Sequence, residues 1–76
     1  MIMECRAKAM EVIEAVRGKE PDYSSDYLDC WNCEVGGKLY RLVKRRIKGS
    51  KGFYPYEERV EVKKGGRWNL IWRRRV

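Results

Sequence analysis

Bases and aromatic rings gather in the second half of this sequence. Residues 1–34 carry four Lys or Arg against eight Asp or Glu, whereas residues 35–76 carry fourteen bases against three acids, and the formal net charge is +7. Each cation that a folded surface brings to a phosphate releases a condensed counterion, so a surface of this charge density attracts polyanions. We therefore expect a small basic protein that binds nucleic acid, RNA or DNA, through phosphates and with little sequence preference.

The loop of residues 48–56 places flat rings beside cationic and flexible positions. Lys48 and Lys51 supply charge, and Phe53 and Tyr54 supply aromatic rings. Charge that holds a backbone and rings that stack on unpaired bases are the two components of single-stranded nucleic-acid sites. In the alternative interpretation, Phe53 and Tyr56 fold back and cap a small core.

The residues that we predict to bind nucleic acid lie on the outer sheet face, in this loop or among the C-terminal arginines. They are Lys44, Arg46, Lys48, Lys51, Phe53, Tyr54, Arg59, Lys63, Lys64, Arg67, Arg73, Arg74 and Arg75. Three adjacent guanidiniums repel one another, so we expect the last three of these residues to form a frayed basic tail that contacts phosphates.

Catalysis has little support in the sequence. The chain has no histidine and no phosphate-cradling glycine motif, so we predict no catalytic residue and no cofactor. The enzyme alternative is a histidine-free ribonuclease of the toxin type, with Glu57, Glu58 or Glu61 as general base. An alternative of another class is a protein-interaction module, such as a small viral or plasmid regulator, that docks an acidic protein partner through the same surface.

The three cysteines are Cys5, Cys30 and Cys33. A structural zinc ion usually takes four Cys or His ligands, so three thiols without histidine predict no metal site. Residues three apart in a strand point to opposite faces, which prevents a bond between Cys30 and Cys33 unless a turn separates them. A bond from Cys5 to whichever of the two faces the core is easier, and buried free thiols are the interpretation that we favour.

The first segment has the spacing of an amphipathic helix over residues 2–17. Its apolar positions recur three and four residues apart and share one face: Ile2, Cys5, Ala9, Val12, Ile13 and Val16. Gly18 is suited to a C-terminal cap. The outer face is acidic and would repel phosphates, so we assign this helix to covering a sheet.

Four β-prone runs follow, and they predict strands over residues 27–35, 38–47, 56–63 and 67–75. Two of the junctions are the pairs Gly36-Gly37 and Gly65-Gly66, which are hairpin signals because glycine accepts positive φ. The short turns favour an antiparallel meander. We therefore predict an α+β fold, one domain over residues 1–76, with the helix packed on a four-stranded sheet that is either open or strongly curled and barrel-like.

Which side chains of each hairpin face the core depends on the register in which its two strands pair. In the second hairpin, a three-residue loop with a glycine bulge would pair Val62 with Trp68 and Val60 with Leu70. Trp68 and Leu70 would then be buried on one apolar face. A two-residue turn would leave both faces half apolar. We favour the three-residue loop, which leaves Trp72 half exposed beneath an arginine. Its outward face is expected to hold Arg59, Glu61, Lys63, Arg67, Asn69, Ile71 and Arg73.

In the first hairpin neither parity is clean, and we expect the odd positions to face inward. Those positions are Tyr27, Trp31, Cys33, Val35, Leu39, Val43 and Ile47. This choice sends Lys44, Arg46 and Lys48 outward, next to the basic loop.

Composition and hydropathy give the remaining expectations. The chain lacks Gln, Thr and His and is rich in Lys, Arg and Glu, a bias of thermophiles. No stretch approaches the length of a membrane span, and the first residues are too charged for the apolar core of a signal peptide. We therefore expect a cytoplasmic, intracellular protein without a membrane partner. Its oligomeric state stays open, and an exposed edge strand offers one route to a dimer.

Overall fold

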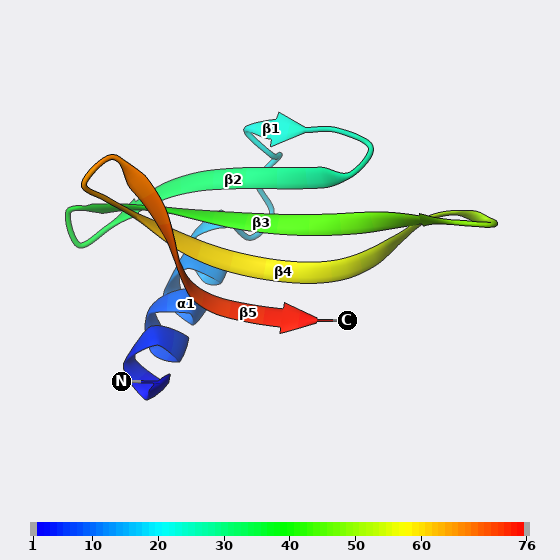
Figure 1. Ribbon diagram of the computed structural model, residues 1–76. Coiled ribbons are helices and arrows are strands. Elements are labelled where there is room, and N and C mark those ends of the chain that lie inside the picture. The colour runs from blue at the N-terminus through cyan, green and yellow to red at the C-terminus, as the bar shows by residue number, and fades with distance from the viewer. Residues whose placement is uncertain (1, 76) are drawn as a thin grey trace.

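The chain folds into one helix followed by an antiparallel sheet (Figure 1). The computed structural model describes the backbone of residues 2–75 and the side chains of residues 5–75. The predicted core position of the Ile2 side chain lies outside the described side chains. In chain order the elements are α1 (Ile2–Val16), β1 (Tyr23–Ser24), β2 (Leu28–Val35), β3 (Lys38–Gly49), β4 (Gly52–Lys64) and β5 (Arg67–Arg75).

The sheet is an open meander of five strands, in the order β1-β2-β3-β4-β5. The predicted α+β fold, with a helix before an antiparallel sheet, is confirmed. The prediction of four strands was wrong because it lacked β1, which is too short to show a periodic pattern, and because it began β4 four residues late. The barrel-like alternative is also wrong, since β1 and β5 lie at opposite edges. Helix α1 is neither long nor apolar enough to cross a membrane, and the described residues contain no other helix.

Helix α1 packs on one face of the sheet, across the half that holds the two Gly-Gly turns (Figure 1). The buried core consists of Ala9, Val12, Val16, Tyr40, Leu42, Val60 and Val62. Val12 and Val60 are fully buried and come from the two opposed layers. Burying a valine stabilises a fold by about 1.5–3 kcal/mol, so these side chains help to hold the helix on the sheet. The expectation that the helix covers a sheet is confirmed.

The first hairpin turns through two residues, Gly36 and Gly37, with φ of 59° and 79°. Cross-strand partners therefore have opposite parity, as in the pair of Trp31 with Leu42. Our choice of odd positions inward is right for β2, where Trp31 packs against the core, and wrong for β3, where Tyr40 and Leu42 face the helix. The error arose because a two-residue turn places odd residues of one strand beside even residues of the next.

Four of the odd positions that we predicted to face inward lie elsewhere. Tyr27, Leu39 and Ile47 are exposed, and Val43 is buried on the face away from the helix.

The second hairpin also turns through two residues, Gly65 and Gly66, so the predicted three-residue loop is wrong. Val62 pairs with Asn69 rather than with Trp68. The prediction looked for one uninterrupted register, whereas a bulge next to Val60 inserts Ile71 as an extra residue of β5.

The bulge divides the apolar residues of β5 between the two faces. Ile71 and Trp72 pack against the core, while Trp68 and Leu70 lie on the other side. The expectation of Ile71 as outward and of Trp68 and Leu70 as core is therefore corrected.

Side-chain hydrogen bonds fix the segment between α1 and β2. The indole nitrogen of Trp31 donates to the carbonyl oxygen of Lys19 at 2.8 Å. Arg46 of β3 donates to the Asp29 carboxylate at 2.6 Å and to the carbonyl oxygen of Ser25. Arg46 therefore ties the turn between β1 and β2 to the centre of the sheet.

We expect Val60→Ala to lower the free energy of unfolding by about 2–3 kcal/mol, because it deletes buried methyl groups and leaves a cavity beneath α1. Urea denaturation followed by circular dichroism measures this loss. Leu39→Ala is the control, since Leu39 is 39% exposed, and it should cost less than about 1 kcal/mol. Equal losses from the two variants would contradict the position of the core.

The Arg46 guanidinium, by hydrogen bonding, holds the pKa of Asp29 below its usual range, and the Ser24 hydroxyl acts in the same direction. A carboxyl with a lowered folded-state pKa stabilises the fold above its unfolded pKa, and this stabilisation disappears as the pH falls through the folded pKa. We expect Asp29→Asn to destabilise the protein at pH 7 and to lose this effect near pH 2, measured by denaturation at both values. Asp26→Asn, a change at an exposed position, should have little effect at either. A loss for Asp29→Asn that is independent of pH would refute this role.

Candidate nucleic-acid interface

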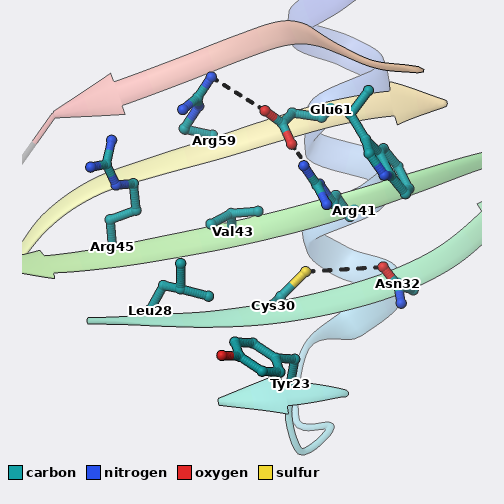
Figure 2. A pocket seen from close by; sticks show the side chains of 10 residues that line it. Tyr23, Leu28, Cys30, Asn32, Arg41, Val43, Arg45, Arg59 and Glu61 are labelled. Atoms are coloured by element: carbon teal, nitrogen blue, oxygen red, sulfur yellow. Dashed lines mark hydrogen bonds and ion pairs between the residues drawn. The ribbon is translucent and has the colours of Figure 1, made fainter. Parts of the chain in front are cut away.

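The face of the sheet opposite α1, here called the helix-free face, carries mostly charged and aromatic side chains. Side chains alternate along a strand and cross-strand partners share a face, so the pairing identifies its members. Its bases are Arg41, Arg45, Arg59, Lys63, Arg73 and Arg75. Figure 2 shows Arg41, Arg45 and Arg59 projecting from this side, with the helix behind the sheet.

Two buried glutamates of β4 lie among these bases. Glu61 is 7% exposed, accepts a hydrogen bond from Arg41 Nε at 2.5 Å and lies 3.2 Å from Arg59 Nη2 (Figure 2). The carboxylate therefore serves two guanidiniums, one from β3 and one from its own strand.

Glu57 repeats this arrangement further along β4. It is 3% exposed and lies 3.2 Å from Arg45 Nη1 and 3.6 Å from Arg73 Nε. Each glutamate is shared by two arginines, so the cluster keeps a positive excess while its guanidiniums are held in fixed positions.

The carboxylates considered for ribonuclease chemistry do not converge. Glu57 and Glu61 lie on the helix-free face, whereas Glu58 lies on the helix side with Lys44 Nζ at 3.7 Å and Arg74 Nε at 3.1 Å. A general base needs an oxygen that is free to take a proton. Each of these three carboxylates already faces two cations.

Trp68 borders a hollow of about 830 Å³ on the helix-free face. The Arg41 guanidinium carbon lies 4.2 Å from the centre of the indole ring, and Lys63 Nζ lies 5.9 Å from it. Both distances fit cation–π contacts. An indole that we expected in the core is therefore part of the charged surface.

The hollow has an apolar floor and a polar rim. Leu28, Cys30 and Val43 line it from β2 and β3, and Tyr23 and Asn32 stand beside them (Figure 2). Burial raises the pKa of the Cys30 thiol, which is therefore protonated at neutral pH. The floor is uncharged as a result.

The structure distributes the predicted binding residues over four places. Arg59, Lys63, Arg73 and Arg75 lie on the helix-free face. Lys44, Arg46 and Arg74 are on the helix side and in ion pairs, Lys64 and Arg67 flank the Gly65-Gly66 turn, and Lys48, Lys51, Phe53 and Tyr54 lie at the far end of the hairpin of β3 and β4.

The expectation that Lys44 and Arg46 lie on the outer sheet face is corrected by the parity of β3. Reversed parity also explains why Arg41 and Arg45 are absent from the predicted binding residues, since the odd positions of this strand were expected to face inward. The signal that would have found them is the length of the Gly36-Gly37 turn.

The C-terminal arginines form part of β5 and are not a frayed tail. Arg73 and Arg75 point to the helix-free face, and Arg74 points to the helix side, where its guanidinium lies 5.4 Å from the centre of the Trp72 ring. Trp72 is half-buried, and its contact with Arg74 confirms the prediction of an arginine above this ring. Alternation along the strand separates the three like charges.

The tip of the β3–β4 hairpin extends past the rest of the sheet (Figure 1). Phe53 meets Tyr27 edge to face, with ring centres 5.5 Å apart, and the Tyr54 ring packs over Gly49. A side chain at Gly49 would collide with that ring. Phe53 therefore packs on Tyr27 and Tyr54 packs on its own hairpin, and Phe53 does not cap the core as the alternative interpretation had it.

The three cysteines are free thiols. Cys30 lies in the hollow and Cys33 packs on the helix side, so the two point to opposite faces as expected. Burial also raises the pKa of Cys33. In the described part of the chain, no group of three or more Cys, Asp or Glu side chains could hold a metal ion.

Comparisons with protein-family models, with curated proteins and with solved structures find no match for this chain. What the protein does therefore has to be inferred from its own surface, because a fold by itself does not determine a function.

Proposed function

We propose that the protein binds nucleic acid through its helix-free face, mainly by contacts to phosphates and without strong sequence preference. The observation that carries this proposal is the gathering of bases from β3, β4 and β5 on one uncovered face, around the two buried carboxylates of Glu57 and Glu61. A cationic surface of this kind concentrates polyanions and releases their counterions.

The paired arginines are suited to phosphates. A guanidinium carries five N–H donors, and Glu61 engages only part of those of Arg41 and Arg59. The remaining donors are free for phosphate oxygens. Because the carboxylate already fixes both side chains, little side-chain entropy is lost when a ligand binds.

Two further bases contribute without such a partner. Lys63 lies beside the Trp68 ring, and the Arg75 guanidinium lies 5.5 Å from the centre of the Tyr56 ring. Among the side chains of residues 5–75, neither forms an ion pair. Their charges are the least compensated on the helix-free face.

Cations at the two ends of the sheet extend this surface. In the proposal, Lys48 and Lys51 at the hairpin tip and Lys64 and Arg67 at the Gly-Gly turn add contacts to the backbone of a longer ligand. The remaining predicted bases lie on the helix side and have structural roles. Arg46 anchors a turn through Asp29, and Lys44 and Arg74 both pair with Glu58.

Aromatic rings favour nucleic acid over an acidic protein partner. Trp68 and Tyr23 border the hollow among the arginines, and flat rings stack on bases but gain little from a polyglutamate chain. Labelled RNA should therefore resist displacement by polyglutamate at equal charge concentration and yield to unlabelled RNA. Complete displacement by polyglutamate would favour the protein-interaction module instead.

We expect the double variant Lys63→Ala, Arg75→Ala to weaken binding to single-stranded and duplex oligonucleotides alike. The slope of log K against log salt should fall by about 1.4 for single strands, because each lost phosphate contact removes about 0.7. Fluorescence anisotropy over a range of salt concentrations measures both quantities.

The matched control is Arg17→Ala, Lys19→Ala, which removes the same charge at exposed positions near the end of α1. It should leave the slope unchanged. Absence of binding by the unmodified protein at low salt, or equal slopes for both double variants, would refute the proposed function.

A further inference from the structure

The hollow on the helix-free face has features that contacts to phosphates do not require. Its volume of about 830 Å³ lies within the range of roughly 300–1,000 Å³ that is typical of ligand pockets. Leu28, Cys30 and Val43 make its floor apolar, and the latter two are buried. An apolar floor gives nothing to a phosphate, but it can shield the face of a planar ring from water.

Flat groups stand on both sides of this floor. On one side, the Arg41 guanidinium carbon lies 4.2 Å from the centre of the Trp68 ring, so these two flat groups form a cation–π pair. On the other side, Tyr23 of β1 pairs with Cys30 of β2 and stands at the edge of the hollow (Figure 2). Unstacked bases are bound between such planes, on aromatic rings or on arginine guanidiniums.

Polar groups are available for the edge of a base and for its phosphates. Asn32 stands at the rim with an amide that can both donate and accept. Arg59 Nε is buried and has no hydrogen-bond partner among the described residues, although the same guanidinium reaches Glu61 through Nη2. A buried donor without a partner is unfavourable, and an acceptor on a ligand in the hollow would satisfy it.

A duplex cannot use this hollow. Its bases are paired and stacked inside, so only phosphates and groove edges would meet the rim. In a single strand, bases can turn outward, stack on protein rings and bring their phosphates to neighbouring cations. The combination of an apolar floor, flanking planes and surrounding arginines therefore selects a single strand.

We propose that the hollow between Tyr23 and Trp68 seats an unpaired base of a single-stranded nucleic acid, with the flanking phosphates on the arginines of the helix-free face. This inference rests on the proposed function and specifies its ligand. The base lies over Val43 and Cys30, stacks against the Arg41–Trp68 pair and is closed in from the β1 side by Tyr23. Asn32 and Arg59 Nε bond its polar atoms.

The first test compares three ligands on the unmodified protein by fluorescence anisotropy at one salt concentration. They are a labelled single-stranded oligonucleotide of mixed sequence, an abasic strand of equal length, and the corresponding duplex. The mixed-sequence strand should bind about 5-fold to 100-fold more tightly than the abasic strand, because stacking of each base contributes about that factor. Equal affinity for the mixed and abasic strands, or tighter binding of the duplex, would overturn the inference and leave binding through phosphates intact.

The second test separates the aromatic ring from the apolar side chain. Trp68→Leu should weaken binding of the mixed-sequence strand by about 5-fold to 100-fold and leave the abasic strand and the duplex within about twofold, since their affinities come from phosphates. Trp68→Phe keeps a stacking surface and should retain most of the affinity. Equal affinity of the two variants for the mixed strand would contradict stacking on this ring.

Two tyrosines provide a matched pair that does not touch the core. Tyr23 and Tyr27 are each 60% exposed, but only Tyr23 lines the hollow. Tyr23→Leu should weaken binding of the mixed-sequence strand and Tyr27→Leu should not, and this comparison decides the matter even if Trp68→Leu fails to fold. Equal effects of the two substitutions would place the base outside the hollow. Absence of any nucleic-acid binding by the unmodified protein would instead refute the proposed function itself.

Discussion

A single fifteen-residue helix lies against one face of the sheet and cannot cover the other. The apolar cluster that contains Val12 of α1 and Val60 of β4 therefore divides the sheet into a side that excludes water and a side that meets it. Residues 2–75 place no second layer on the helix-free face, and there the side chains themselves have to be compatible with water. Charged residues on alternate positions of β3 and β4 satisfy this requirement, and they also create the surface on which the proposed function rests.

Many like charges on one sheet would repel one another if nothing separated them. The structure meets this cost by placing Glu57 and Glu61 among the arginines, so that each carboxylate lies between guanidiniums from different positions. Buried ion pairs of this kind contribute little net stability, because desolvation offsets most of the attraction. Their main effect here is geometric. Arginines that would otherwise sample many rotamers are held above the sheet, which suits the recognition of a regularly charged ligand.

The sequence predicted the elements well and their faces poorly, and the reason is the range of the interactions involved. Helix spacing and glycine pairs are local signals, so α1 and the positions of both Gly-Gly turns were predictable, although the length of the second turn was not. Facing in a hairpin depends on turn length and on bulges, and a change of one residue moves a side chain such as Trp68 from core to surface. The bulge at Ile71 lets this side chain pack on the side of a helix that lies more than fifty residues earlier in the chain. No local sequence pattern contains that information. Arg41 and Arg45 were missed because the two-residue Gly36-Gly37 turn reverses the parity of β3 relative to β2.

The bulge in β5 also explains how one edge strand serves two purposes. Without it, regular alternation would assign Trp68, Leu70 and Trp72 to one face, and the strand would belong either to the core or to the surface. With Ile71 inserted, Ile71 and Trp72 close the core while Trp68 and the 44%-exposed Leu70 lie among arginines. Large apolar side chains on a charged face do not serve the packing of the chain. Departures from local regularity are expected at functional sites, and Trp68, which the bulge leaves on the charged face, borders the hollow.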